Sequence, residues 1–385
     1  MPIAIQLVPT ERSDSNIHRS PARHIHIVHV TEALGGGVLY LLHQLIKAQI
    51  EAGFEVTLIH SVRKETPDSR TLDQLFPPPI SRIVVRMTTN ISLKADLNSF
   101  NEIAKTLRTL RPNILHLHSS KAGALGRVAA RFAGLDKHLY YSPHGFSFLR
   151  RDVSMIKRAM FFSLEVIAGL FGGKIIASCN SEGRLANKLV GHRRVNVVEN
   201  CTDASTFSKT EKTPNDLVKV ISAGRLCYQK APWLFWKLSA LLSLENAKFC
   251  WIGEGELRIQ LKEGLAQERV QVSGWVDRDC LWREMHNADI FVMTSLWEGM
   301  PLTLLDAQAI GLPAVVSDVM GCRDVVINGV TGFVCRSDAE LVEKTRELIR
   351  NAELRTKMGR AAINMTRERF SITRMHGEIL NSYGN

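Results

Sequence analysis

The sequence predicts an α/β protein in which two Rossmann-like, doubly wound domains face each other across a cleft. Three observations support this prediction: apolar strands alternate with helices, the alternation restarts near residue 216, and a polar segment separates the two series. With 385 residues, the chain is long enough for two such cores. Open α/β sheets bind ligands beyond the carboxyl ends of their strands, so we expect the functional site in the cleft.

The first series opens with the apolar run HIHIVHV (24–30), a glycine cluster, a leucine-rich helix at 38–52 and the strand FEVTLIH (54–60). This βαβ order is typical of a parallel sheet, because parallel neighbours need a crossover helix. Later strands are expected at 82–87, 113–118, 139–144, 174–178 and 195–200, with helices between them, for example at 94–110 and 121–133.

The second series follows a polar, proline-containing segment at 203–216, which is the predicted linker. Its strands are expected at 216–224, 247–253, 270–274, 288–294 and 314–317, and its helices at 231–243 and 255–267. We therefore divide the chain into four parts: a disordered extension (1–22), an N-terminal domain (23–203), a C-terminal domain (204–370) and a C-terminal helix (371–385) that packs back on the N-terminal domain.

Composition narrows the class of protein. Seven cysteines without a C-x-x-C pair suggest neither a zinc site nor a disulfide framework, which fits a reducing cytoplasm. The apolar stretch 159–173 is shorter than the roughly 20 residues of a membrane-spanning helix. Residues 1–205 hold 26 Lys and Arg against 16 Asp and Glu. This positive excess fits a phosphate-bearing ligand, anionic lipid or nucleic acid.

Gly35, Gly36 and Gly37 follow the first strand and precede a helix. Backbone amides there can approach a diphosphate closely, and a helix N-terminus favours negative charge. The run is not G-x-G-x-x-G, however, and the second strand ends in His60 and Ser61, with no acid for a dinucleotide ribose. This argues against a dehydrogenase. A tight turn that needs small residues is the alternative interpretation.

Two cations follow the first strand of the second series. Arg225 and Lys230 are five residues apart in a strand-to-helix loop, where both can reach into the cleft. Arginine offers a fixed fork of donors and lysine a mobile point charge, so the pair suits a diphosphate. Two solvated surface cations are the alternative.

Two acids, Glu298 and Asp306, lie eight residues apart in SLWEGMPLTLLDA, a loop that leads into a helix. A carboxylate accepts two hydrogen bonds and so suits a vicinal diol, such as the ribose hydroxyls. Glu298 could equally cap the helix, since acids are favoured at helix starts. Asp277 and Asp279 match the D-x-D pattern of metal sites, but they precede a helix, where capping is commoner. We expect no metal and no cofactor.

The stretch from Glu298 to Asp306 resembles the E-x7-E signature of retaining glycosyltransferases of family 4, which have the two-domain GT-B fold. The resemblance covers residues 24–375. GRLCYQKA (224–231) is similar to the family's phosphate-binding loop. Further segments are similar to its second domain, namely WIGEGE (251–256), VSGWV (272–276) and GVTGFV (329–334).

The resemblance implies that the C-terminal domain binds a nucleotide sugar and the N-terminal domain the acceptor. Glu298 is then expected on the hydroxyls of the donor sugar and Asp306 on the ribose, with Arg225 and Lys230 on the diphosphate. Asp306 stands where glutamate is usual in the family. Its side chain is one methylene shorter, so the ribose contact is expected to shift or to use water. The other implied donor-binding residues are Gly36, Gly37, Gly299, Met300, Pro301 and Leu302.

HLHSSKAGALGRVAARFAG (116–134) and YYSPHGFSF (140–148) are similar to bacterial members that build capsule, O-antigen or exopolysaccharide repeats. The similarity implies that His144 lies beside the reacting sugar and that His118 and Lys121 line the acceptor side. Taken alone, a strand-end histidine is more often structural. The implied reaction is same-face attack that retains the anomeric configuration, with the nascent phosphate accepting the acceptor's proton. The implied catalytic set is His144, Glu298, Arg225 and Lys230.

Residues 150–174 mix basic side chains with a broad apolar surface. We expect most of this segment to form a core helix, although such a segment can also lie on an anionic membrane surface. Together with the family, it predicts a cytoplasmic enzyme, peripheral on the inner face of the plasma membrane. From the resemblance to the family, we expect its donor to be a UDP-sugar and its acceptor to be a polyprenyl-diphosphate-linked glycan.

Two alternatives remain. One is a sugar-nucleotide epimerase of the same fold, which is expected to carry further acids and histidines around the sugar. The other is a basic nucleic-acid-binding protein, but the sequence shows no such module, so we expect no nucleic-acid partner.

Overall fold

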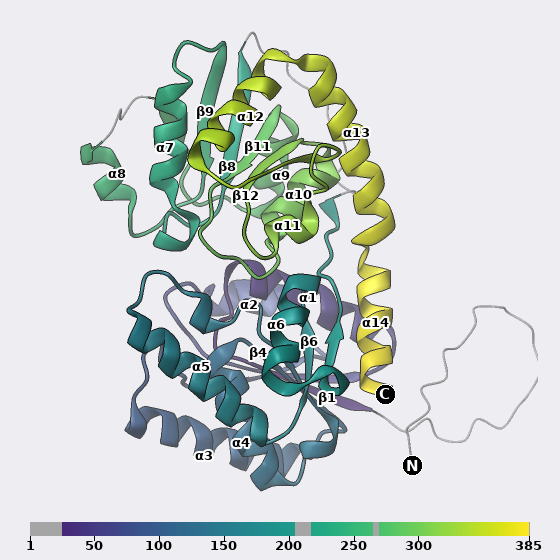
Figure 1. The fold of residues 1–385 in the computed structure, drawn as a ribbon. Coiled ribbons are helices and arrows are strands. Elements are labelled where there is room, and N and C mark those ends of the chain that lie inside the picture. The colour runs from purple at the N-terminus through teal and green to yellow at the C-terminus, as the bar shows by residue number, and fades with distance from the viewer. Residues whose placement is uncertain (1–24, 205–216, 265–268, 385) are drawn as a thin grey trace, which may run out of the picture.

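The computed structural model describes residues 25–204, 217–264 and 269–384. These form two α/β domains, with two consecutive helices running along one side of both (Figure 1). The predicted fold class of two Rossmann-like domains is confirmed. The expected disordered extension (1–22) and most of the expected linker (205–216) lie outside the described residues.

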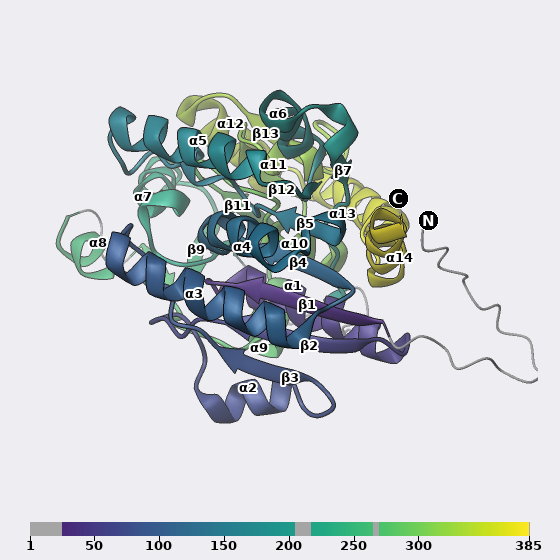
Figure 2. The same cartoon turned by 90° about the horizontal axis from the view of Figure 1, so that it is seen from below.

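The first domain has a parallel sheet in the order β3-β2-β1-β4-β5-β6-β7. Its strands are β1 (His26–Thr31), β2 (Glu55–His60), β3 (Ser81–Val84), β4 (Ile114–His118), β5 (Leu139–Ser142), β6 (Lys174–Ala177) and β7 (Val195–Val197). Its helices are α1 (Gly36–Glu51), α2 (Ser69–Leu75), α3 (Leu93–Leu110), α4 (Ser120–Ala133), α5 (Met155–Leu170) and α6 (Asn180–Val190). Helix α4 packs on both α3 and α5, as Figure 2 shows from below.

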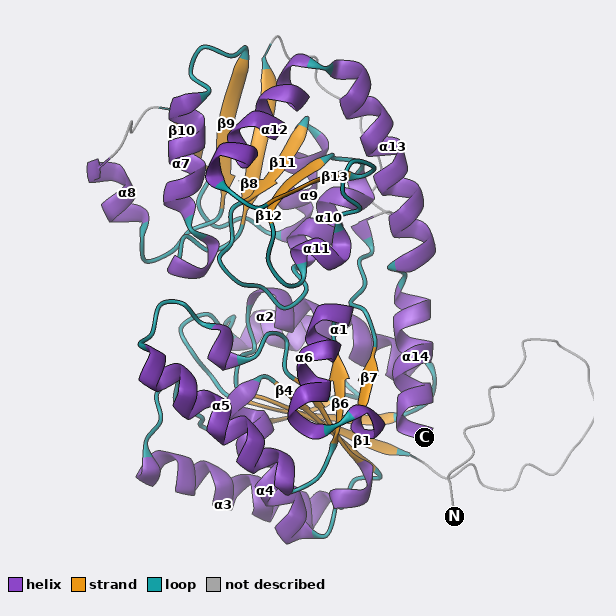
Figure 3. Cartoon of the chain, viewed as in Figure 1, coloured by secondary structure: helices purple, strands orange, loops and turns teal. Residues whose placement is uncertain are grey.

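The second domain has a parallel sheet in the order β10-β9-β8-β11-β12-β13, with its strands between helices (Figure 3). Its strands are β8 (Val218–Ala223), β9 (Ala247–Ile252), β10 (Val270–Val272), β11 (Ile290–Met293), β12 (Ala314–Ser317) and β13 (Gly332–Cys335). Its helices are α7 (Pro232–Leu241), α8 (Arg258–Gly264), α9 (Arg278–His286), α10 (Leu302–Ile310), α11 (Cys322–Val325) and α12 (Asp338–Arg350).

In both sheets the strand order reverses beside the first strand. Strand β1 lies between β2 and β4, and β8 lies between β9 and β11. Such a reversal opens a crevice at the carboxyl ends of the central strands, because successive connections leave in opposite directions. The loops that carry the predicted site residues follow these central strands.

All four edge strands differ from the sequence expectation: β3, expected at 82–87, ends at Val84, and β10, expected at 270–274, ends at Val272. The strand expected at 195–200 ends at Val197, because the chain then leaves the sheet and crosses to the second domain. There the Asn200 side-chain amide donates to the Met300 carbonyl at 3.1 Å. Strand β13 was not expected, since its glycine-flanked sequence carries only a short apolar pattern.

The last two helices, α13 (Ala352–Arg369) and α14 (Ile372–Gly384), link the domains. Helix α13 packs on α10 of the second domain, and α14, which corresponds to the helix expected at 371–385, packs on α1 of the first. Phe370, between them, is fully buried, and its carbonyl accepts the Thr202 N–H at 3.0 Å.

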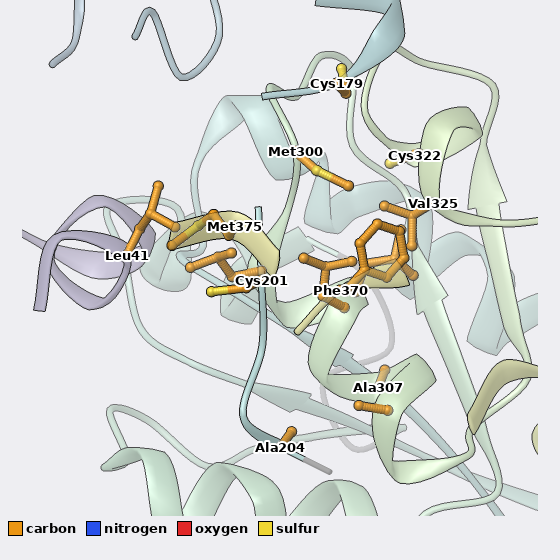
Figure 4. Close-up of a cluster of buried hydrophobic side chains, with 14 of the residues drawn as sticks. Leu41, Cys179, Cys201, Ala204, Met300, Ala307, Cys322, Val325, Phe370 and Met375 are labelled. Carbon is orange, nitrogen blue, oxygen red and sulfur yellow. The ribbon is translucent and has the colours of Figure 1, made fainter. Parts of the chain in front are cut away.

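One hydrophobic cluster crosses the domain boundary (Figure 4). It contains Leu41 of α1 and Met375 of α14 from one side, and Met300 and Ala307 from the other, together with Phe370, which joins α13 to α14. Burial of one continuous apolar surface favours a fixed arrangement of the two domains, because separating them would return that surface to water.

Helix α5 is not the core helix that we expected. Its buried residues are Glu165, Ala168 and Gly169, and the Glu165 carboxylate accepts from Arg127 at 2.7 Å and from the Tyr141 hydroxyl at 2.8 Å. The acid that interrupts the apolar stretch thus anchors the helix. The apolar side chains of α5 instead face outward, and the exposed ones are Met155, Ile156, Met160, Phe162, Leu164, Ile167 and Leu170.

Candidate active site

The domains touch through two loops, His144–Gly145 after β5 and Glu298–Gly299 after β11. A Cβ added to Gly299 would lie 2.7–2.8 Å from backbone atoms of His144 and Gly145. Any side chain at this position would therefore push the loops apart, so the close approach requires glycine. The contact brings two predicted site residues, one from each domain, to the same point of the fold.

Glu182, at the start of α6, holds the His144 loop. Its carboxylate accepts the Gly145 N–H at 2.7 Å, and the N–H and hydroxyl of Ser178, both at 2.7 Å. His144 itself has φ +54°, a left-handed conformation that needs such support in a non-glycine residue. Burial raises the pKa of the Glu182 carboxyl, although the hydrogen bonds oppose the rise. Sequence reasoning missed Glu182, since an acid in the first turn resembles an ordinary cap.

Lys230 and Glu298 form an ion pair at the cleft edge of the second sheet. Lys230 Nζ is 2.7 Å from Glu298 Oε1, and the two side chains are 17% and 7% exposed. Burial alone would lower the pKa of Lys230, but the charge and hydrogen bond of Glu298 outweigh it and raise the pKa. The structure therefore brings these two predicted residues together, largely shielded from solvent.

Arg225 lies nearer the solvent. Its side chain is 50% exposed, and its Nε is 3.9 Å from a Glu256 carboxylate oxygen. Across the cleft, the pKa of Asp152 is lowered mainly by its hydrogen bond with Arg150 and also by the charge of Arg225. The two predicted diphosphate cations thus lie in different surroundings, Lys230 in the interior and Arg225 at the mouth.

Two helices, α1 and α10, begin at this cleft without a side-chain cap. Their N-cap residues are Gly35 and Pro301. The first N–H groups of a helix have no intrahelical acceptor, so these starts favour an anion. A Cβ added to Gly37 would lie 3.6 Å from Leu302 Cδ1, and nothing lies within 4 Å of one added to Gly36. The glycine cluster and the start of α10 are therefore neighbours across the domain boundary.

Asp306 is fully buried and already paired. Its Oδ1 accepts from Thr202 Oγ1 at 2.6 Å and from Arg278 Nη2 at 2.8 Å. Burial raises the pKa of Asp306, and Arg278, Thr202 and Trp282 oppose the rise. The Arg278 guanidinium also lies 3.2 Å from the ring centroid of Tyr40 in the first domain. Asp306, the residue expected to bind the ribose, thus contacts Thr202, which precedes the linker, Arg278 of α9 and, through Arg278, Tyr40 of α1.

The D-x-D segment contributes its arginine rather than its acids to these contacts. The Asp277 carboxylate accepts the Cys280 N–H at 2.7 Å and caps α9, as the capping interpretation expected, and Asp279 lies in the first turn. Sequence reasoning did not identify Arg278, because its partners come from α10 and the linker.

A row of hydrogen-bonded side chains crosses the buried face of the first sheet. Gln49 Oε1 lies 2.8 Å from His29 Nε2, His29 Nδ1 lies 2.9 Å from His118 Nε2, and His118 Nδ1 lies 3.0 Å from His144 Nε2. We call these four residues the imidazole row. His26 and His29 are three residues apart and so lie on opposite faces of β1, and only His29 joins the row. Gln49 comes from α1, and the sequence gave no signal for it.

His116, the neighbour of the row on β4, is bonded at both nitrogens, to the Tyr383 hydroxyl at 2.7 Å and to Ser142 Oγ at 2.9 Å. Nitrogens of His29, His116 and His118 lie within 4.8 Å of one another, as a metal site would require. Every ring nitrogen of the three has a protein hydrogen-bond partner, however, which favours a hydrogen-bonded network over metal ligation.

Lys121 points away from the row. Its Nζ is 2.7 Å from Asp96 Oδ1 and 2.6 Å from the Asn90 carbonyl. Its N–H and that of Ala122 donate to the buried Glu32 carboxylate at 3.1 and 2.9 Å. Glu32, which ends the first strand, thus caps α4, and its role was not recognised from the sequence.

Two family models match the chain. The Glycosyltransferase Family 4 model covers residues 35–206, and the Glycosyl transferases group 1 model covers residues 203–365. The UDP-Gal:alpha-D-GlcNAc-diphosphoundecaprenol alpha-1,3-galactosyltransferase of Escherichia coli is 32% identical over 267 residues, which are 64% of this chain and 68% of that protein. The chain belongs to glycosyltransferase family 4. This glycosyltransferase is also 26% identical over 322 residues to an uncharacterised protein of the cps region of Klebsiella pneumoniae, covering 80% of this chain and 86% of the relative.

Solved structures share the fold of this glycosyltransferase. Anabaena HepE, in complex with UDP and glucose, superposes with a TM-score of 0.75 at 17% identity, over 93% of this chain and 99% of HepE. The lipopolysaccharide outer core galactosyltransferase WaaB gives a TM-score of 0.69 at 18% identity, over 93% and 99%. The predicted family and GT-B fold are confirmed, while the roles of individual residues stay predictions.

Proposed function

We propose that this glycosyltransferase moves a hexose from a UDP-sugar to a polyprenyl-diphosphate-linked glycan, with retention and without a metal ion. The shielded Lys230–Glu298 pair carries the proposal. Glu298 belongs to the loop that meets the His144 loop and leads into α10, whose uncapped start neighbours that of α1. Donors for a developing anion and an acceptor for sugar hydroxyls are therefore available at one site.

The proposed leaving group is UDP. Negative charge grows on the diphosphate as the bond to the sugar breaks, and Lys230 and the first N–H groups of α1 and α10 can stabilise it. These protein donors take the place that a divalent cation has in metal-dependent transferases. Arg225 is proposed to close the mouth of the site. Asp306 is proposed to hold the ribose, whose hydroxyls would join or replace Thr202 at its carboxylate.

Retention is proposed to follow from same-face attack, with Glu298 on the sugar hydroxyls and His144 beside the reacting sugar. The buried carboxylates on the first-domain side support this choice. Glu32 and Glu182 each accept at least two backbone N–H donors. A carboxylate held in this way is a poor nucleophile, which argues against double displacement. The departing phosphate takes the proton of the acceptor hydroxyl.

The lipid-linked acceptor is proposed from two lines of support. The Escherichia coli relative is named for a diphosphoundecaprenol-linked acceptor, and the Klebsiella relative is named for a cps region. In addition, α5 presents exposed apolar side chains beside cations, including Ile156 at 83% and Ile167 at 52%, near Arg151 and Lys157. Such a face suits an anionic membrane surface, on which a polyprenyl acceptor is embedded. No helix in the described parts of the chain is both long and apolar enough to cross a bilayer.

Turnover tests the transferase proposal. We expect the full-length protein to transfer sugar from one of a panel of UDP-hexoses to GlcNAc-diphospho-polyprenol, in the presence of EDTA, with an α-linked product from an α-linked donor. A β-linked product would exclude retention. Loss of activity in EDTA with rescue by Mn²⁺ would exclude metal independence. An isomerised nucleotide sugar, formed without acceptor, would instead identify an epimerase.

Vesicle sedimentation tests the membrane proposal. We expect binding to phosphatidylglycerol vesicles and little binding to phosphatidylcholine vesicles. Replacing Ile156 and Ile167 by serine should weaken binding roughly tenfold or more, because each buried isoleucine contributes about 1.5–3 kcal/mol. Leu244→Ser is the matched control, since Leu244 is 99% exposed on the second domain. Equal loss in the control, or no loss in the α5 variant, contradicts a membrane role for α5.

A further inference from the structure

The imidazole row leads from the core to the cleft. Gln49, His29 and His118 are at most 1% exposed, whereas His144 is only partly buried. His29 on β1 pairs in register with His116 on β4, and both strands direct these side chains to the face that α1 covers. The row is thus built from three neighbouring strands and one helix, and it ends at the residue expected beside the sugar.

The rings of the row are neutral at physiological pH. Burial lowers the pKa of His29 and of His144 to about 4, and it holds the pKa of His118 well below its ordinary value. The other groups that face the row are His116, whose ring lies beside that of His118, and Tyr383, which interacts with Gln49. Ser142 is bonded to His116, and the Glu182 carboxylate accepts the N–H of Gly145, next to His144. A neutral imidazole carries one N–H, so one nitrogen of each ring donates and the other accepts.

Gln49 sets the direction of the hydrogen bonds. Its amide oxygen can only accept, so His29 Nε2 carries the proton and His29 Nδ1 accepts from His118 Nε2. His118 Nδ1 then accepts from His144 Nε2. One ring determines the next, because each link between two rings joins two nitrogens that share a single proton. The Nδ1 of His144 is left without a proton.

We propose that Gln49, His29 and His118 are positioning residues that hold His144 in the tautomer whose Nδ1 accepts a hydrogen bond from a substrate hydroxyl. The proposal rests on the proposed function for the nature of that substrate, a hydroxyl-rich sugar. An imidazole fixed as an acceptor binds a hydroxyl. It disfavours a group that can only accept, such as a fluorine at the same position. The row therefore contributes to substrate choice from the interior of the sheet.

Nuclear magnetic resonance of the full-length protein with ¹⁵N-labelled histidine tests the tautomer directly, without any turnover. At pH 7.5 we expect His144 to give the pattern of a neutral ring with its proton on Nε2. A proton on Nδ1, or a doubly protonated ring, overturns the proposal. Because this measurement needs no substrate, it stands or falls separately from the proposed transferase activity.

Paired variants of His29 test whether the row sets that tautomer. Leucine removes the acceptor, whereas asparagine can place a carbonyl oxygen near the former position of Nδ1. We expect His29→Leu to lower kcat roughly 5- to 150-fold, as for one lost buried hydrogen bond, with little change in KM. His29→Asn should restore both kcat and the Nε2–H pattern of His144. Equal activity and an unchanged His144 spectrum in both variants overturn the proposal.

Two further variants separate positioning from folding. Gln49→Met removes the acceptor from the inner end of the row and should reproduce His29→Leu, which keeps the test open if the leucine variant fails to fold. His376→Leu is the matched control, because it removes a partly buried histidine whose Nε2 has no hydrogen-bond partner among the described residues. We expect the control to keep its kcat and its His144 spectrum. If the Gln49→Met variant keeps the wild-type kcat and the wild-type His144 spectrum, the direction assigned to the hydrogen bonds of the row is wrong.

Discussion

Two carboxylates of one motif, Glu298 and Asp306, each pair with a cation, yet the two pairs differ in what surrounds them. The Lys230–Glu298 pair lies at the ends of neighbouring strands and keeps 17% and 7% of its side chains exposed toward the cleft. In the Arg278–Asp306 pair the acid is fully buried, and the arginine lies over Tyr40 of the other domain.

This difference shows that the eight-residue spacing between Glu298 and Asp306 does not by itself give the two acids the same role. The first pair is accessible to a ligand, and its charges are available where a diphosphate and sugar would lie. The second pair is enclosed by the linker, α9 and α1, so in this structure it contributes first to the arrangement of the domains. A buried pair of this kind is costly to break, because the remaining charge has neither water nor a partner.

The largest effect should come from breaking the enclosed pair. Arg278→Met leaves the Asp306 carboxylate unpaired, and we expect the free energy of unfolding to fall by about 3–5 kcal/mol. Urea denaturation measures this. Adding Asp306→Leu should recover most of the loss, since an apolar pair can replace a buried ion pair. A single variant as stable as the wild type would show that the pair does not join the domains.

Breaking the cleft pair should instead affect the reaction. Lys230→Ala removes a donor to the leaving diphosphate, and we expect kcat to fall roughly 10²- to 10³-fold. Steady-state rates, together with an unchanged melting temperature, would place the effect in the transition state. A loss of tenfold or less, in a folded variant, would mean that the diphosphate is bound elsewhere.

UDP affinity sharpens the contrast between the two acids. We expect Asp306→Asn to weaken UDP binding roughly 10- to 150-fold, as for one hydrogen bond to a charged group. Glu298→Gln should barely change it, because UDP lacks the sugar that Glu298 is proposed to contact. Calorimetry with both variants decides. Equal losses of UDP affinity in the two variants would contradict the separate roles. An unchanged UDP affinity in Asp306→Asn would mean that Asp306 has only a structural role.

The smallest effect is expected at the mouth. Arg225 is half exposed, and solvent screens its charge, so Arg225→Ala should lower kcat/KM by about tenfold or less. The loss should shrink further in high salt, whereas that of Lys230→Ala should not. A salt-independent loss as large as that of Lys230→Ala would place Arg225 inside the site with the bound donor.

The sequence pointed to both Lys230 and Glu298 as site residues, although not to the ion pair between them, and their nearness follows from one edge of the sheet. Lys230 and Glu298 follow β8 and β11, which are neighbours in the sheet, and a parallel sheet brings such loops together. The Arg278–Asp306 contact depends on how α9 and the linker pack, which no spacing records. His116 and His118 of β4 are two residues apart and so share one face, but Gln49 and Glu182 belong to helices whose docking only the structure shows.

Tyr383 links the completion of the site to the order in which the chain is synthesised. Its hydroxyl bonds His116, and its carbonyl accepts the Tyr140 hydroxyl at 2.8 Å, although the ribosome adds Tyr383 267 residues after His116. The strands of the first sheet can form earlier in synthesis, but the polar side chains on this face have no α14 to meet until the ribosome has added Tyr383. A nascent chain thus holds a folded first domain before it holds a finished site. Helix α14, which is made after the whole second domain, completes the first domain.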